Sequence, residues 1–209
     1  MAPRMNSTQA ELLVLDLETS GVNPFRHQVL SVGMVPLNGN EQPKVVYVRP
    51  KEICWTEYAQ EHFAKYAAEW EAKAVPPTQA CVEIERYLVD RFPHTAVTPV
   101  GHNVGFDVAF LRQLAFDGSR DQLAGLSHRA IDTHTLLYLL FHGGLIPSSA
   151  LTSDGAFRHF GITVPKPLRH TALGDVVATR DLVRALLKRF SFEDGIVTAH
   201  AQDVGETSL

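Results

Sequence analysis

The chain has 209 residues, of which 45% are hydrophobic and 20% are charged, so it has ample apolar material for the core of one globular domain. Its formal net charge is −4, and residues 191–209 contain four acids and no Lys or Arg, so that the rest of the chain balances 19 acids against 19 bases. This balance excludes a strongly basic surface for non-specific binding of nucleic acid, so any nucleic acid must be bound by a small local site.

The first predicted strand, Leu12 to Leu17, places two acids at the end of an apolar run. The stretch VLDLETSG, Val14 to Gly21, is a short apolar run closed by a turn signal, which favours a buried central strand. Because side chains alternate along a strand, Asp16 and Glu18 point to the same face, with α-carbons roughly 6.5–7 Å apart. Two carboxylates at the edge of a core repel each other, so we expect a positive partner between them.

The remaining elements predict an α/β fold with helices on the faces of a mixed sheet. Strands are expected over Gln28–Leu37 and Lys44–Val48, joined as an antiparallel meander, and over Val97–His102. Single helices are expected over Glu57–Ala74, Gly105–Phe116, Thr133–Phe141, Ala150–Phe160 and Thr171–Phe190. A further helix is expected to begin after Thr78, which would be its N-cap. We expect one domain over residues 1–190 and an acidic, flexible tail over residues 191–209.

An aspartate lies within the apolar stripe of the helix that follows the fourth predicted strand, Val97–His102. In VGHNVGFDVAFLRQL, Asp107 shares a stripe with Phe110, Leu111 and Leu114 at helical spacing. A carboxylate on the packing face of a helix needs a partner, because burying a bare charge is expensive.

The last long helix has a histidine just before it and an aspartate in its early turns. In KPLRHTALGDVVATRDLVRALL, Thr171 is the expected cap, Asp175 follows it, and His170 lies on the preceding loop close to Asp175. Lys166 and Arg169 add positive charge beside His170, which suits a phosphate, although a solvated loop explains them equally well.

Three segments together resemble one family. Asp-x-Glu-Thr at residues 16–19, Gly-His-Asn-x-x-Phe-Asp at 101–107 and His-x-Ala-x-x-Asp at 170–175 are similar to the motifs of the DEDDh, DnaQ-like 3′→5′ exonucleases. That group includes the proofreading subunit of bacterial replicative polymerase, ribonuclease T and oligoribonuclease. The resemblance covers roughly Leu12 to Leu187, and the motifs match in order and in spacing scale.

This resemblance implies a ribonuclease H-like fold and a metal-dependent 3′→5′ exonuclease. It implies two divalent ions, Mg²⁺ or Mn²⁺, held by Asp16, Glu18, Asp107 and Asp175, and hard divalent ions do favour carboxylate oxygens. His170 would be the general base, and an imidazole titrates near neutral pH. The product would be a nucleoside 5′-monophosphate, removed one at a time from the 3′ end of single-stranded DNA, RNA or a short oligonucleotide.

The same resemblance implies the contacts with the substrate and the partners. Thr19 should contact the terminal nucleotide, and His102, Asn103 and Phe106 should line its pocket. Stacking of Phe106 or a neighbour on a base is a further expectation. A homodimer and association with a polymerase are left open, since no sequence feature demands either.

Two rival functions stay open at this stage. One is a catalytically idle exonuclease fold that binds nucleic acid or a polymerase, although a pure binding module has no need to crowd four carboxylates. The other is a metal-dependent nuclease that requires no 3′ end. Asp132, in Ala-Ile-Asp-Thr-His-Thr, is interpreted as a helix cap.

The sequence also predicts the compartment. Two cysteines, Cys54 and Cys81, are too few for a disulfide framework and indicate a reduced, cytoplasmic setting. The N-terminus lacks the apolar segment of a signal peptide, and no run approaches the roughly 18 apolar residues that span a membrane.

Overall fold

The computed structural model describes residues 11–193 and 196–199, and its centre is a mixed five-stranded sheet. The strand order is β3 (Lys44–Tyr47), β2 (Val29–Pro36), β1 (Leu12–Thr19), β4 (Thr98–Gly101) and β5 (Ile131–Asp132). Strand β1 pairs antiparallel with β2 and parallel with β4, and β2 pairs antiparallel with β3. The predicted central position of the first strand and the predicted meander are therefore confirmed.

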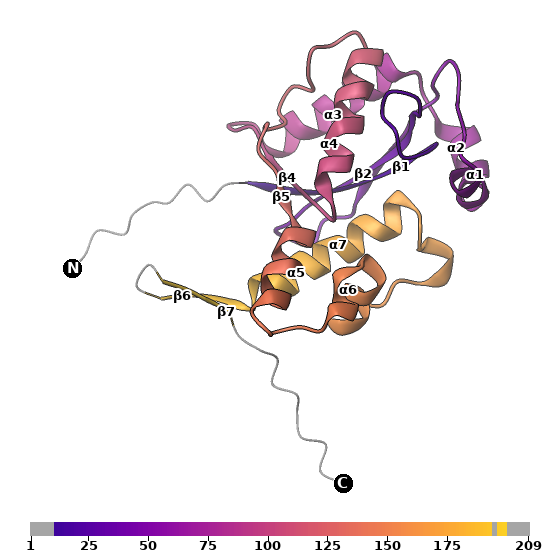
Figure 1. Cartoon of the computed structure of the whole chain (residues 1–209). Coiled ribbons are helices and arrows are strands. Elements are labelled where there is room, and N and C mark those ends of the chain that lie inside the picture. The colour runs from indigo at the N-terminus through magenta and orange to yellow at the C-terminus, as the bar shows by residue number, and fades with distance from the viewer. Residues whose placement is uncertain (1–10, 194–195, 200–209) are drawn as a thin grey trace.

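Helices cover both faces of this sheet (Figure 1). Helices α3 (Pro77–Arg91) and α4 (Val104–Asp117) cover one face, and α7 (Ala172–Leu187) covers the other. Helices α5 (Thr133–His142) and α6 (Ser153–His159) pack against α7 in an apolar cluster of their own. The expected α/β fold with a mixed sheet is confirmed.

The alternation of side chains along β1 decides which face of the sheet carries Asp16 and Glu18. Leu13, Leu15 and Leu17 are buried in the cluster formed with α3 and α4. Val14 belongs to a separate cluster with residues of α7, on the opposite face. Because side chains alternate with period two, Asp16 and Glu18 share the face of Val14 and look toward α7.

A glycine of β2 lets α7 approach the sheet at this point. Gly33 pairs with Asp16 in the register of β1 and β2. A β-carbon added at Gly33 would lie 2.3 Å from the carbonyl oxygen of Ala172, the first residue of α7. Only a residue without a β-carbon allows the start of α7, and with it Asp175, to lie directly over Asp16.

The helix predicted over Glu57–Ala74 is wrong as a single element. The structure has two helices, α1 (Glu57–Phe63) and α2 (Ala67–Lys73), separated by a tight turn in which the amide of Tyr66 bonds the carbonyl of Phe63. Helix α1 buries no residue, whereas α2 buries Trp70, whose indole N–H donates to the carbonyl of Val48 at 2.8 Å. One straight helix cannot both extend over the surface and pack Trp70 against the sheet edge.

The predicted helix starts are partly confirmed. Thr171 caps α7 and Asp132 caps α5, since their side chains accept from the amides of Gly174 and His134. Thr78 is not a cap, because α3 already begins at Pro77, whose fixed φ and missing N–H suit the first helical position.

The segment predicted as one helix over residues 150–160 also differs. It begins as a 3-10 turn, Ser148–Leu151, and α6 then starts after Thr152, whose hydroxyl accepts from the amide of Gly155 at 3.1 Å. A threonine side chain that accepts a backbone amide in this way starts a new helix, so the cap at Thr152 divides the segment in two.

The region expected to be a flexible tail contains a hairpin. Strands β6 (Phe190–Glu193) and β7 (Ile196–Ala199) pair antiparallel, and residues 194–195 and 200–209 lie outside the described part of the chain. Ile196, Val197 and Thr198 are β-branched, and this composition favours a strand although the segment is acidic. None of the helices in the described residues is long and apolar enough to cross a membrane.

Candidate active site

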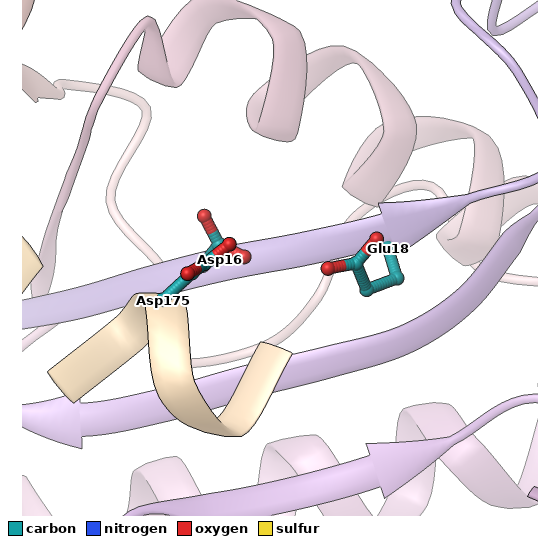
Figure 2. Close-up of side chains that lie close together, drawn as sticks. All are labelled: Asp16, Glu18 and Asp175. Atoms are coloured by element: carbon teal, nitrogen blue, oxygen red, sulfur yellow. The ribbon is translucent and has the colours of Figure 1, made fainter. Parts of the chain in front are cut away.

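Three carboxylates converge where β1 meets the start of α7. One oxygen each of Asp16, Glu18 and Asp175 lies within 4.8 Å of the others. Figure 2 shows the first two side chains projecting from β1 and the third from the first turn of α7. The structure therefore brings together three of the four acids that the sequence singled out.

The fourth acid, Asp107, reaches β1 from the opposite face of the sheet. It lies in the first turn of α4, and its Oδ1 accepts the backbone amide of Leu17 at 3.1 Å, between Asp16 and Glu18. Strand β1 pairs with β4 from Leu12 to Val14, and beyond this pairing the amide of Leu17 donates to a side-chain acceptor instead. Asp107 lies close enough to raise the pKa of Asp16, although it is outside the three-carboxylate group.

Burial and mutual repulsion raise the pKa of each acid in this cluster. Burial is the largest cause for Asp16, whose pKa lies well above its ordinary value, and Asp107, Asp175 and Glu18 raise it further. Burial and Asp175 raise the pKa of Glu18 to about 8. Burial likewise raises the pKa of Asp107 to about 8, against the lowering effect of the Leu17 amide. Ionising these carboxyl groups therefore costs free energy, and a bound cation offsets that cost.

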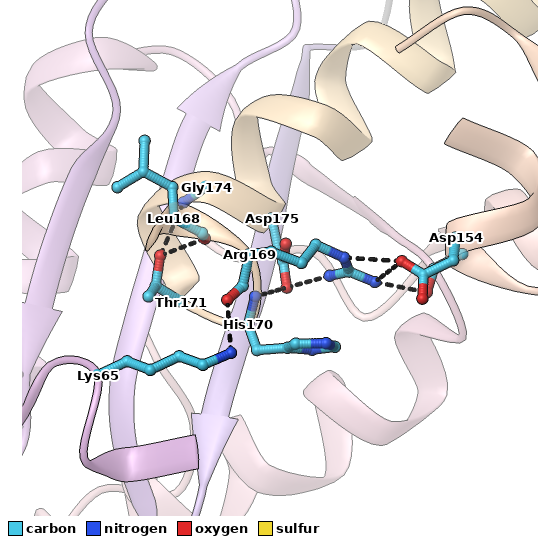
Figure 3. Close-up of polar contacts among 9 residues, drawn as sticks. Lys65, Asp154, Leu168, Arg169, His170, Thr171, Gly174 and Asp175 are labelled. Atoms are coloured by element: carbon cyan, nitrogen blue, oxygen red, sulfur yellow. Dashed lines mark hydrogen bonds and ion pairs between the residues drawn. The ribbon is translucent and has the colours of Figure 1, made fainter. Parts of the chain in front are cut away.

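Arg169 supplies part of the positive charge from within the protein (Figure 3). Its guanidinium bonds Asp175 Oδ2 at 2.5 Å and Asp154 at 2.7–2.8 Å, and it also donates to the hydroxyl of Ser153. Arg169 was expected beside a phosphate, but here two carboxylates already engage it. Lys166 is exposed on the 3-10 turn Lys166–Leu168.

His170 lies on the loop between this turn and α7, as the sequence predicted. Its φ of 60° is left-handed, and its amide donates to Asp175 Oδ2 at 3.1 Å. The imidazole meets that of His62 on α1 edge-on, with ring centroids 4.8 Å apart. Burial lowers the pKa of His170, and the neighbouring Arg169, Lys65 and His62 lower it further, so the ring favours its neutral form.

The residues expected to hold the substrate lie at the ends of β1 and β4. The Thr19 hydroxyl donates to the carbonyl of Gly21 at 2.7 Å. His102 Nδ1 lies 3.0 Å from the Thr133 hydroxyl, and burial lowers the pKa of His102 to about 4. Asn103 is exposed with a left-handed φ of 60°.

Phe106, the last of these expected residues, lies partly in the core. It is partly buried, packs against the α3–α4 cluster, and its ring centroid is 4.7 Å from that of Phe110. Only part of this ring is therefore open to a ligand.

Three further residues, which no sequence motif singles out, contact residues of the candidate site. Lys65, in the turn between α1 and α2, donates to the Arg169 carbonyl at 3.1 Å and lowers the pKa of Glu18. His62 contacts His170, and Asp154 holds Arg169. No local pattern marks these residues, because each is brought to the site by an element distant in sequence from its partner.

The cluster fits a divalent cation. Asp175 Oδ1 is buried and has no hydrogen-bond partner within the described residues, while its Oδ2 is taken by Arg169 and the His170 amide. A buried carboxylate oxygen without a donor is costly unless a cation meets it. Three clustered carboxylates with raised pKa values are the oxygen ligands that hard divalent ions prefer.

Comparison with known proteins gives related sequences and structures. No protein-family model matches the chain. A "DNA polymerase III subunit epsilon-like protein" of Rhodobacter capsulatus is 37% identical over 115 residues, which cover 54% of this chain and 15% of that protein.

Solved structures of E. coli exonuclease I share the fold. A complex of that enzyme with single-stranded DNA superposes with a TM-score of 0.72 at 19% identity over 87% of this chain and 41% of the other. A product-bound structure of exonuclease I gives a TM-score of 0.70 at 17% identity, over 86% of this chain and 44% of that one.

These matches confirm the resemblance to DnaQ-like exonucleases that the three motifs predict, and the chain has the ribonuclease H-like α/β fold. The chain spans less than half the length of either the relative or these enzymes.

Proposed function

We propose that this protein is a metal-dependent 3′→5′ exonuclease that releases nucleoside 5′-monophosphates from single-stranded DNA, RNA or short oligonucleotides. The observation that carries the proposal is the convergence of Asp16, Glu18 and Asp175 within 4.8 Å, with Asp107 beside them. The similarity to exonuclease I, solved in complex with single-stranded DNA, supports this substrate class. The name of the epsilon-like relative supports the same activity.

The four carboxylates are proposed to hold two divalent ions, Mg²⁺ or Mn²⁺. Bound there, such ions neutralise charge on the scissile phosphate and stabilise attacking and leaving oxygens. The raised pKa values of Asp16, Glu18 and Asp107 and the unpartnered Oδ1 of Asp175 support this assignment.

His170 is proposed to take a proton from the attacking water. Hydrolysis adds this water across the bond between phosphorus and the 3′ oxygen, giving a 5′-monophosphate and a new 3′ hydroxyl. The lowered pKa of His170 keeps its ring neutral near pH 7, as a base requires. The bond from its amide to Asp175 ties the loop to the acidic cluster.

The remaining roles are proposed from position and resemblance. Thr19, His102, Asn103 and Phe106 would contact the terminal nucleotide, and the exposed Lys166 would meet a phosphate. Arg169 would act as a positioning residue, because its guanidinium orients Asp175.

The assay uses a 5′-labelled single-stranded oligonucleotide with Mg²⁺ or Mn²⁺, with and without EDTA. We expect a stepwise ladder that EDTA abolishes, and no cleavage of a circular single strand, since only a nuclease that requires no 3′ end cuts a circle. Activity that survives EDTA, or cleavage of the circle, would sink the proposal. His170→Ala should lower kcat far more than it weakens binding, and an equal loss of both would contradict the base role.

An idle exonuclease fold that binds nucleic acid or a polymerase is the alternative. It predicts binding without any ladder, and Asp16→Ala would then leave every measured property except stability unchanged. The converging acids favour the enzyme.

We also propose the setting of this activity. Residues 1–190 would form one exonuclease domain, acting in the cytoplasm as a monomer or homodimer. The relative's name supports a test for association with a polymerase, by co-purification of the two proteins.

A further inference from the structure

We propose that the groove between the β1–β2 loop and the outer face of α4 binds the single strand 5′ of its terminal nucleotide. This inference rests on the proposed exonuclease function, which supplies the strand and places its 3′ end at the acidic cluster. The groove is lined by Pro24, Phe25, Ala109, Arg112, Gln113, Phe116 and Asp117.

Two phenylalanines stand in solvent on opposite walls of this groove. Phe25 is 95% exposed and Phe116 is 79% exposed. Exposing a whole phenyl ring is unfavourable, and exposed apolar surface around a groove marks an interaction site. Flat rings presented at a groove are suited to stacking of bases, which is tolerant of sequence because every base has a π-face.

The loop that carries Phe25 is held in place by polar contacts. The amide of Phe25 donates to Asn23 Oδ1 at 2.9 Å, and the amide of Asn23 donates to His27 Nδ1 at 2.9 Å. The Gln113 side chain on α4 donates to the carbonyl of His27, also at 2.9 Å. The loop lies beside α4 in Figure 1, and this bond joins the two walls. These hydrogen bonds therefore fix the loop that presents the exposed ring of Phe25.

Two guanidiniums accompany the rings. Arg112 lines the groove and Arg26 follows Phe25 in the loop, and both are exposed. Within the described residues neither side chain has an ion pair or hydrogen bond, unlike Arg169. Within the lining Arg112 balances Asp117, the one carboxylate, and Arg26 in the adjoining loop adds one further positive charge. Aromatic rings beside unpaired arginines favour a polyanion with stacking bases over a purely apolar partner.

The groove continues from the expected nucleotide pocket. Ala109, Gln113 and Phe116 lie three, seven and ten residues beyond Phe106, on one side of α4. At 1.5 Å per residue, Phe116 lies about 15 Å along the helix axis from Phe106. At the rise of about 3.4 Å per nucleotide that one strand has when stacked as in a duplex, this span corresponds to roughly four nucleotides. A dinucleotide therefore stays short of Phe116, whereas a dodecamer reaches it.

The test measures binding of fluorescein-labelled single-stranded oligonucleotides by anisotropy in EDTA, so that no hydrolysis is needed. We expect Phe25→Ser with Phe116→Ser to lower the ratio of dodecamer affinity to dinucleotide affinity about fivefold or more. Arg112→Gln should reduce the slope of log K against log salt by about 0.7, the value for one phosphate contact on a single strand. Leu139→Ser is the matched control, because Leu139 is 63% exposed on α5, outside the groove.

Several outcomes overturn the inference. An unchanged affinity ratio in the double serine variant, or a loss that Leu139→Ser reproduces, shows that the groove holds no strand. Self-association in sedimentation that the double variant abolishes assigns the face to a second copy instead. A loss of dodecamer affinity in a protein that shows no exonuclease ladder supports the groove and rejects the proposed function, so the two failures are distinguishable.

Discussion

Replacing Glu18 by Gln should stabilise the metal-free protein at alkaline pH. Burial, and after it the charge of Asp175, raises the pKa of Glu18 to about 8, against the lowering effects of Lys65 and Arg169. Between about pH 4.5 and pH 8 the folded protein keeps a proton that the unfolded chain releases. Stability contributed by this group is therefore lost as pH rises through that window. Gln carries no charge at any pH and avoids the loss.

The magnitude follows from the shift and from the geometry. A rise from 4.5 to about 8 corresponds to about 5 kcal/mol in favour of the neutral form. Two full charges 4.8 Å apart, the outer limit within the cluster, repel by about 3 kcal/mol at an effective dielectric constant of 20. Glu18 is partly exposed, and solvent screens the repulsion. We therefore expect a gain of about 2–4 kcal/mol near pH 8.5 and less than about 1 kcal/mol near pH 5.

Urea denaturation in EDTA at both pH values measures this difference directly. Asp90→Asn is the control, since Asp90 is exposed and lies outside the cluster. Mn²⁺ should then stabilise the wild-type protein more than the Gln variant, because the variant has lost a ligand. Two results would refute the reasoning. One is a free energy of unfolding of the wild-type protein in EDTA that does not fall from pH 5 to pH 8.5. The other is a Gln variant whose stability changes no more than that of the Asp90→Asn control.

Three further substitutions probe the same architecture. Gly33→Ala places a β-carbon against the carbonyl of Ala172 and should cost about 1–3 kcal/mol. It should also reduce the rise in Tm caused by Mn²⁺, and an undiminished rise would argue against close approach of α7. Asp107→Asn keeps an acceptor for the Leu17 amide, so metal-free stability should hold while calorimetry shows weaker Mn²⁺ binding; equal losses of both would contradict this. Burial, and after it His134, lowers the pKa of His102 to about 4. The stability that the neutral imidazole contributes is therefore lost as pH falls from about 6.5 to 4. The free energy of unfolding of His102→Gln should fall less steeply than that of the wild-type protein over this pH range.

Features encoded by short-range periodicity could be read from the sequence. The alternation of β1 placed Asp16 and Glu18 on one face, and the apolar stripe of α4 placed Asp107 toward the core. The caps of α5 and α7 at Asp132 and Thr171 were equally local. Each depends on residues within one or two turns of each other, so no knowledge of the rest of the chain is needed.

Other features depended on contacts between distant residues. The break between α1 and α2 follows from packing Trp70 against the edge strand, and it brings Lys65 and His62 to the site. The engagement of Arg169 by Asp154 required α6 to pack beside the loop before α7. Helix propensity is a weak preference that such packing overrides, so a sequence that favours one long helix still folds as two.

The sequence by itself determined which acids this protein has, on which faces of their elements they lie and which exonuclease motifs they match. Only the tertiary structure decided how near they lie, because Gly33 admits the start of α7 to the sheet and Leu17 receives Asp107 from the opposite layer. Coulomb repulsion and desolvation depend on distance and burial, both set by packing, so the raised pKa values that favour a cation arise only in the folded chain.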